Sequence, residues 1–180
     1  MLVLVLCLFV VCGTNAEDLS ELEKAMMTTG SINRIEYTDS SAVGYGEYDK
    51  CDVIFQTVSA YNMKTENTAY GVRLFLRDSD GYYHYAYIDM SEIDDIILAL
   101  EYIKENTASA SIETQLEYIT NNGISIRSVI NKGGKYIFIS QGETYFIRSI
   151  FQEEKIDDII NAFNTAKANI EMKITASISE

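Results

Sequence analysis

Hydrophobic and polar residues alternate along eight stretches of the chain, and this alternation predicts β-strands. It places successive side chains on opposite faces, so that one face of each strand packs on a core. Val, Ile, Tyr and Phe are frequent in these stretches, as is typical of strands, and polar or glycine-containing turns separate them. The predicted strands are Ile32–Thr38, Cys51–Tyr61, Tyr70–Arg77, Tyr82–Ile88, Ile112–Thr120, Gly123–Asn131, Lys135–Ser140 and Tyr145–Phe151.

Apolar residues recur at three- and four-residue spacing in two further stretches, one after each group of four strands. This spacing predicts amphipathic helices whose apolar side faces the core. The first helix is expected to begin near Ser91 and the second near Glu154. Ser91, with Asp94 three residues later, resembles a capping box and therefore predicts an N-cap. The apolar positions are Ile93, Ile96, Ile97, Leu100 and Ile103 in the first helix, and Ile156, Ile159, Ile160, Phe163 and Ile170 in the second.

The pattern also makes predictions about the two ends of the folded region. A third amphipathic helix is expected from Asp18 to about Thr28, and Gly30 lies just beyond it, where a C-cap glycine belongs. The short polar tail from Lys173 is expected to fray.

The second half of the chain resembles the first. Residues 93–100 read IDDIILAL and residues 156–163 read IDDIINAF, which are identical at six of eight positions at an offset of 63. The predicted fold class is therefore α+β, with two ββββα repeats (about 31–106 and 111–171) forming antiparallel sheet with helices packed on it. Neither half is large enough to bury both faces of four strands, so we expect a single domain over 17–180. The same offset also matches Gly71 with Gly134, Phe75 with Phe138 and Tyr82 with Tyr145.

Residues 1–16, MLVLVLCLFVVCGTNA, are typical of a signal peptide. An apolar run too short to cross a bilayer as a helix precedes small residues, so cleavage is expected before Glu17. The run lacks the usual Lys or Arg after the first Met. We expect export to the periplasm or the extracellular space. Lipoprotein anchoring at Cys12 is the weaker alternative, because Val11 rather than a small residue precedes it.

Composition and charge narrow the function classes. Hydrophobic residues make up 47% of the chain, which predicts a folded core, and the net charge of −13 disfavours nucleic acid as a partner. No membrane span is expected in the mature chain. Only Cys51 remains after cleavage, so an internal disulfide is excluded. Cys51 is interpreted as a small apolar residue at the start of a strand, and a nucleophile or an intermolecular bridge is the less favoured alternative.

The tyrosine-rich segment 82–89, YYHYAYID, is the strongest candidate for a binding surface. In a strand its odd-numbered tyrosines share one face, and His84 shares the other with Ala86 and Ile88. His84 aligns with Ile147 in the repeat and is interpreted as a packing residue. The tyrosines either form a platform for a protein, peptide or glycan or stabilise the sheet by packing, and the packing interpretation is favoured. The candidate ligand-binding residues are Tyr83, Tyr85 and Tyr87.

Catalytic and metal-binding motifs have weaker support. The pairs Asp94–Asp95 and Asp157–Asp158 fall in the first turn of the predicted helices, where the helix dipole favours negative charge. Arg77–Gly81, RDSDG, starts like a calcium loop, but its glycine comes too early, so a hairpin turn is expected. We expect no cofactor, metal or catalytic residue. The sequence favours an exported, non-catalytic binding module, and a hydrolase that uses scattered carboxylates is the alternative.

Two segments resemble a family of small exported bacterial proteins without an assigned activity. They are YIDMSEIDDIILALEYI (Tyr87–Ile103) and TQLEYITNNGISI (Thr114–Ile126). The resemblance spans most of the mature chain. It implies export and a bacterial origin, and it carries no catalytic or binding residues over to this chain.

Overall fold

The computed structural model describes residues 19–44, 53–77, 82–107, 115–141 and 148–178. The predicted signal peptide with its cleavage site, Cys51 and most of the RDSDG turn lie outside these residues. The helices are α1 (Glu21–Met27), α2 (Ile93–Thr107) and α3 (Ile156–Ile178), and the 3₁₀ turns are η2 (Met90–Glu92) and η3 (Glu153–Lys155). The strands are β1 (Asn33–Val43), β2 (Val53–Asn62), β3 (Asn67–Arg77), β4 (Tyr83–Asp89), β5 (Leu116–Ile119), β6 (Ile124–Asn131), β7 (Gly134–Gln141) and β8 (Arg148–Gln152).

The eight strands form two antiparallel sheets of four, ordered β1-β2-β3-β4 and β5-β6-β7-β8. Each sheet follows the chain as a meander and is succeeded by a 3₁₀ turn and an α-helix. The predicted α+β class is therefore confirmed. The recurrence of four strands, 3₁₀ turn and helix is compatible with the internal repeat that the sequence predicts.

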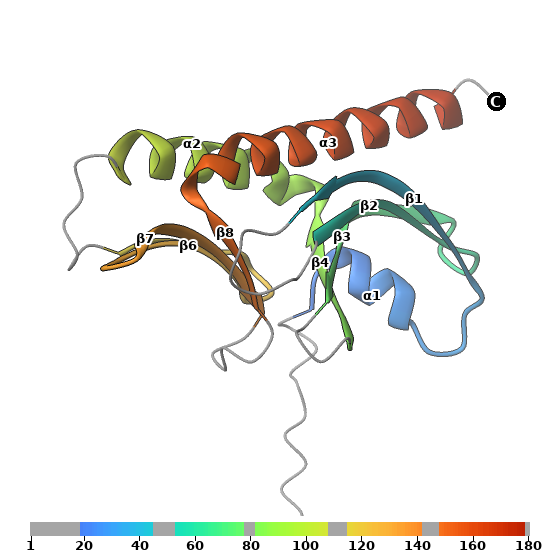
Figure 1. Cartoon of the computed structure of the whole chain (residues 1–180). Coiled ribbons are helices and arrows are strands. Elements are labelled where there is room, and N and C mark those ends of the chain that lie inside the picture. Colours follow the sequence, from blue (N-terminus) through green and yellow to red (C-terminus); the bar gives the residue numbers. More distant parts are fainter. Residues whose placement is uncertain (1–18, 45–52, 78–81, 108–114, 142–147, 179–180) are drawn as a thin grey trace, which may run out of the picture.

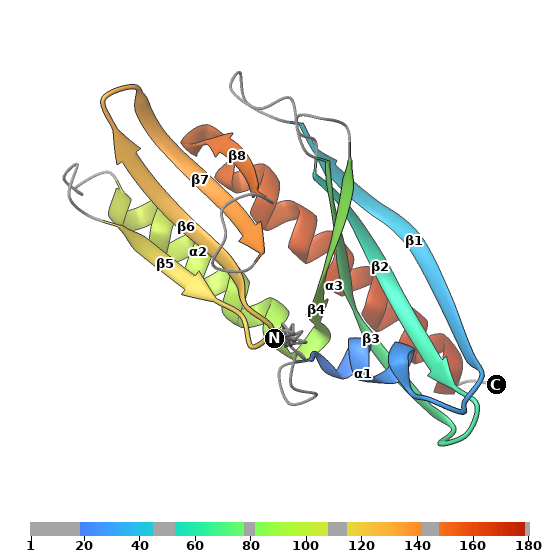
Figure 2. The ribbon, with the colours of Figure 1, turned by 90° about the horizontal axis from the view of Figure 1, so that it is seen from below.

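The two long helices exchange sheets, in the sense that each one packs on the sheet that it does not directly follow in the chain. Helix α3 contacts β1, β2 and β3 of the first sheet, whereas α2, which comes directly after that sheet in the chain, contacts β5 and β6 of the second. Figures 1 and 2 show both helices on one side of the two sheets. Phe163 of α3 meets Phe55 of β2 edge-on, with ring centroids 5.0 Å apart. One cluster of buried residues therefore draws on both sheets and both helices.

Two reciprocal ion pairs join α2 to α3. Lys104 Nζ of α2 lies 2.6 Å from Asp157 Oδ1 of α3, and Lys167 Nζ of α3 lies 2.6 Å from Asp94 Oδ1 of α2. The hydrogen bond to Asp94 raises the pKa of Lys167. Exposed pairs of this kind add little stability. Their symmetry is informative, because the two lysines are 63 residues apart and so are the two aspartates. The two ion pairs are therefore equivalent under exchange of the two helices, as contacts across a twofold axis are.

The predicted capping box at Ser91 is wrong. Ser91 lies inside the 3₁₀ turn Met90–Glu92, and α2 begins only at Ile93. The second half makes the same transition through Glu153–Lys155. The chain thus leaves each sheet through a tight turn, which places the start of the helix beyond the Ser91 hydroxyl.

Both predicted ends of the folded region also need correction. Helix α1 ends at Met27, so Gly30, with a φ of 73°, belongs to the turn after the helix and not to its C-cap. The tail does not fray at Lys173, because α3 continues to Ile178. Ile174 packs against the main core within this extension, and that burial holds the last turns in place.

Candidate functional site

The face of the first sheet that points away from α3 is only partly covered. Helix α1 lies over one end of this outer face (Figure 1). Its Leu22 is fully buried and forms a small second core with Val58 and Ala60 of β2. Gly71 of β3 allows this approach, since a Cβ there would lie 3.1 Å from Leu22 Cδ2 and 2.2 Å from the Ile88 carbonyl oxygen.

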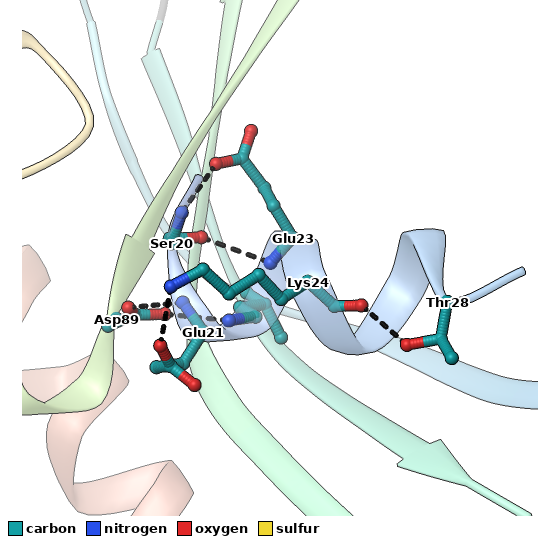
Figure 3. Close-up of polar contacts among 7 residues, drawn as sticks. Ser20, Glu21, Glu23, Lys24, Thr28 and Asp89 are labelled. Atoms are coloured by element: carbon teal, nitrogen blue, oxygen red, sulfur yellow. Dashed lines mark hydrogen bonds and ion pairs between the residues drawn. The ribbon is translucent and has the colours of Figure 1, made fainter. Parts of the chain in front are cut away.

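Four hydrogen bonds cap the first turn of α1, and two of them come from the sheet (Figure 3). Ser20 Oγ accepts from the Glu23 N–H, and Glu23 Oε2 accepts from the Ser20 N–H, each at 3.0 Å. This is a capping box. Asp89, at the end of β4, adds a tertiary cap, because its two carboxylate oxygens accept from the N–H groups of Glu21 at 2.7 Å and Leu22 at 2.9 Å.

Replacing Asp89 by Ala should loosen α1. The change removes both tertiary bonds and an anion from the helix N-terminus, so the free energy of unfolding should fall by about 1–2 kcal/mol. Compared with the wild type, the variant should show faster amide hydrogen exchange in α1 and unchanged exchange in α2. Glu105→Ala, which removes an exposed carboxylate of α2, serves as the control. Unchanged protection of α1 in Asp89→Ala would argue against the tertiary cap.

Beyond α1, the outer face carries a group of aromatic and polar side chains that we call the outer patch. Direct cross-strand partners place them on one face: Ile54 pairs with Phe75, Phe75 with Tyr85, and Gln56 with Arg73. Tyr37 of β1 extends the patch toward α1. The patch consists of Tyr37, Ile54, Gln56, Arg73, Phe75 and Tyr85, of which Tyr37 is 41% exposed and Tyr85 43%.

Arg73 occupies the centre of the outer patch. Its Cζ lies 3.6 Å from the ring centroid of Tyr37 and 4.7 Å from that of Tyr85, which are cation–π distances. Its Nε and Nη2 both donate to Gln56 Oε1, the former at 2.7 Å. Phe75 supports Tyr85 from the side, with centroids 5.1 Å apart and the rings inclined by 63°. The described partners that fix the orientation of the guanidinium are thus all neutral.

The electrostatics of the outer patch are unusual for so acidic a chain. Within the described residues no carboxylate lies at ion-pair distance from Arg73. Burial, followed by a hydrogen bond with Tyr87, raises the pKa of the Tyr37 hydroxyl, and the charge of Arg73 opposes this rise. Tyr37 therefore stays protonated at neutral pH. Arg73 has no ion-pair partner among the described side chains. Asp39 of β1 is the cross-strand partner of Gln56 on this face, and its side chain lies outside the described part of the structure.

Tyr85 and Tyr87 lie on the same face of β4, as predicted, opposite Phe75 and Arg73, but their surroundings differ. Tyr85 lies in the outer patch, whereas Tyr87 is half-buried and packs against the α1 core. Tyr83 belongs to β4, but its side chain lies outside the described part of the structure. The predicted face of His84 is confirmed: it is half-buried on the side of β4 that carries the buried Ala86.

The sequence prediction missed Tyr37, Gln56 and Arg73. A signal for Arg73 and Phe75 was present, because alternation in β3 puts them on one face. Their meeting with residues of β1, β2 and β4 depends on strand register. In β1 that register shifts between Asp39 and Ser41, which no pattern in the sequence indicates.

The paired carboxylates of the helices have structural partners. Both aspartate pairs lie in the first turn of their helices, as predicted. Asp94 and Asp157 bind lysines of the opposite helix. Glu92 is buried and accepts a hydrogen bond at 2.7 Å from the Asn121 N–H, which ties the β5–β6 turn to η2. Among the described residues no three metal-ligating side chains cluster.

A polar groove of about 250 Å³ lies on the other face of the first sheet, beneath the last turns of α3. Glu36 in this groove is flanked by Arg34 Nε at 3.4 Å and Lys173 Nζ at 4.0 Å. Because both of its cations already pair with Glu36, the groove is a weaker candidate for a charged ligand than the outer patch.

Comparison with known proteins assigns no function to the candidate site. No protein-family model matches the chain, and no curated protein is significantly similar to it. Within the described part of the chain, no helix is both long and apolar enough to cross a bilayer.

Proposed function

We propose that this protein is an exported, non-catalytic binding module that holds a peptide segment of a partner protein on the outer patch. The observation that carries the proposal is Arg73, a cation in contact with the rings of Tyr37 and Tyr85 that has no ion-pair partner among the described side chains. Arg and Tyr are among the residues most enriched at the energetic centres of protein interfaces. Location in the periplasm or the extracellular space is supported by the signal-like segment 1–16 and by the resemblance to small exported bacterial proteins.

A peptide fits the outer patch better than a glycan. Glycan binding uses the open flat faces of aromatic rings. Here one face of Tyr37 and one face of Tyr85 are against the guanidinium, and Phe75 packs on Tyr85 from the side. The remaining surface is a mixture of ring edges, an aliphatic side chain and one polar group. Apolar and polar side chains of a peptide match such a surface.

Peptide selection with a matched pair of variants tests the proposal. Peptides of twelve residues are selected from a displayed random library against the wild-type protein, and their affinities are then measured for Tyr85→Ser and Tyr102→Ser. Tyr102 is a fitting control, because it lies on α2, away from the patch, and is 58% exposed. Selected peptides should lose at least about tenfold in affinity for Tyr85→Ser, since a central interface aromatic contributes this much, and should be unaffected by Tyr102→Ser.

Two results would count against the proposal. One is a selection that enriches no peptide. The other is a set of enriched peptides whose affinities for Tyr85→Ser and Tyr102→Ser are the same, which would place binding elsewhere on the molecule.

A further inference from the structure

We infer that Arg73 is the anchor of a carboxylate-recognition site, and that the segment bound on the outer patch presents one acidic side chain between apolar ones. This inference rests on the proposed binding function and names the chemistry of its ligand. It follows from three features of the patch: the donors that Arg73 has left, the charge around it, and the side chains that flank it.

The hydrogen bonds of Arg73 leave one edge of its guanidinium for a ligand. A guanidinium has five N–H donors in a planar fork, which matches a carboxylate in a two-bond geometry. Gln56 Oε1 takes one hydrogen bond from Nε and one from Nη2. Within the described residues no acceptor bonds to Nη1. The Nη1–Nη2 edge is therefore the side on which a carboxylate can bind.

The surroundings of that edge are arranged to keep it in place. The rings of Tyr37 and Tyr85 lie against the guanidinium, and the hydrogen bonds to Gln56 keep the guanidinium from turning within its own plane. A side chain that is already ordered loses less conformational entropy when a ligand binds. Arg73 is thus prepared for binding before any ligand arrives.

Charge favours a carboxylate over a phosphate. Arg73 offers one positive charge, and a carboxylate brings one negative charge that balances it. A phosphate monoester carries about −1.5 to −2 charges at neutral pH, so it would leave excess negative charge on a chain whose net charge is already −13. The match is therefore one cation to one singly charged anion.

Apolar side chains border the guanidinium in the next row of the sheet. Ile54, Phe75 and Tyr85 are cross-strand neighbours in that row, and none of them is fully buried. They give an apolar surface directly beside the proposed carboxylate position. The ligand that fits carries an acidic side chain flanked by aliphatic or aromatic ones.

A peptide array with paired members tests the inference. Nine-residue peptides, acetylated and amidated at their ends, are made twice, with Glu or Gln at the central position between Leu and Phe. Each pair then differs in a single charge. Full-length mature protein should bind the Glu member at least about tenfold more tightly than the Gln member, because a charge-assisted bidentate pair is lost in the latter.

Three variants assign the preference to Arg73. Arg73→Gln should abolish the difference between Glu and Gln peptides. Arg34→Gln removes the same charge from the opposite face, where Arg34 is exposed, and should leave the difference intact. Gln56→Glu supplies a carboxylate to Arg73 from within the chain, so it should suppress binding of the Glu peptide without unfolding the protein. This last variant keeps the test decisive if Arg73→Gln is unstable.

The outcomes separate this inference from the proposed function. Peptides that bind in a Tyr85-dependent way but equally well with Glu and Gln would overturn the carboxylate site and leave the binding module standing. A Glu preference that survives both Arg73→Gln and Gln56→Glu would also overturn it. If no array member binds, or if a polygalacturonate oligosaccharide binds at the patch instead, peptide carboxylate recognition is wrong.

Discussion

Cutting the chain between α2 and β5 should give two fragments that are each unfolded alone and that regain the native fold when they are mixed. The first fragment would keep the sheet β1–β4 but lose α3, which covers that sheet, and the second would keep β5–β8 but lose α2. Each sheet would then expose the apolar face that the missing helix buries, and a small domain has no stability to spare for such a loss.

Circular dichroism of the separate fragments and of their equimolar mixture checks this expectation. The mixture should recover the near-ultraviolet signal of packed aromatic side chains, and the recovery should depend on concentration because it is an association. The intact chain gives the reference signal. A fragment that melts cooperatively on its own would show that one half is self-sufficient, contrary to the exchange of helices.

Replacing Phe163 by Ala should lower the free energy of unfolding by about 3–5 kcal/mol, the range typical of a buried phenylalanine. Phe163 has no exposed surface and packs edge-on against Phe55. Its loss would open a cavity between α3 and the first sheet, where both walls are regular elements that cannot collapse easily. Urea denaturation of the full-length protein measures the change.

Phe75→Ala is the control for this prediction. It removes the same side chain from the half-buried outer patch of the same sheet, where solvent fills the space, so the loss should stay below about 2 kcal/mol. Equal losses for the two variants would contradict the assignment of Phe163 to the core beneath α3.

Hydrophobic alternation predicts the strands well because it reports directly on burial. The strand predicted at Tyr82–Ile88 is observed as Tyr83–Asp89, and the one at Cys51–Tyr61 as Val53–Asn62 within the described residues. Polarity alone misjudged the last turns of α3, where a single residue, Ile174, supplies the packing. Local patterns succeed where burial follows sequence neighbours and fail where a distant contact decides.

The exchange of helices and the centre of the outer patch could not be predicted for the same reason. An amphipathic helix fits either sheet, so the apolar stripe of α3 does not reveal which one it covers. Arg73 becomes part of a candidate site only through its contacts with Tyr37 and Gln56, which come from two other strands. A register shift of one residue would send its side chain to the opposite face.

The exchange of helices also fixes the order in which the fold can be completed during synthesis. The last strand of the first sheet ends at Asp89, but the helix that covers this sheet begins only at Ile156. At roughly 5–20 residues per second, this interval takes on the order of 3–13 s. Throughout it, the nascent chain presents the uncovered side chains of Phe55 and Leu74 to its surroundings. Protection by a chaperone is therefore needed most while the second half is being made, and a slow codon there would prolong the exposure of the first.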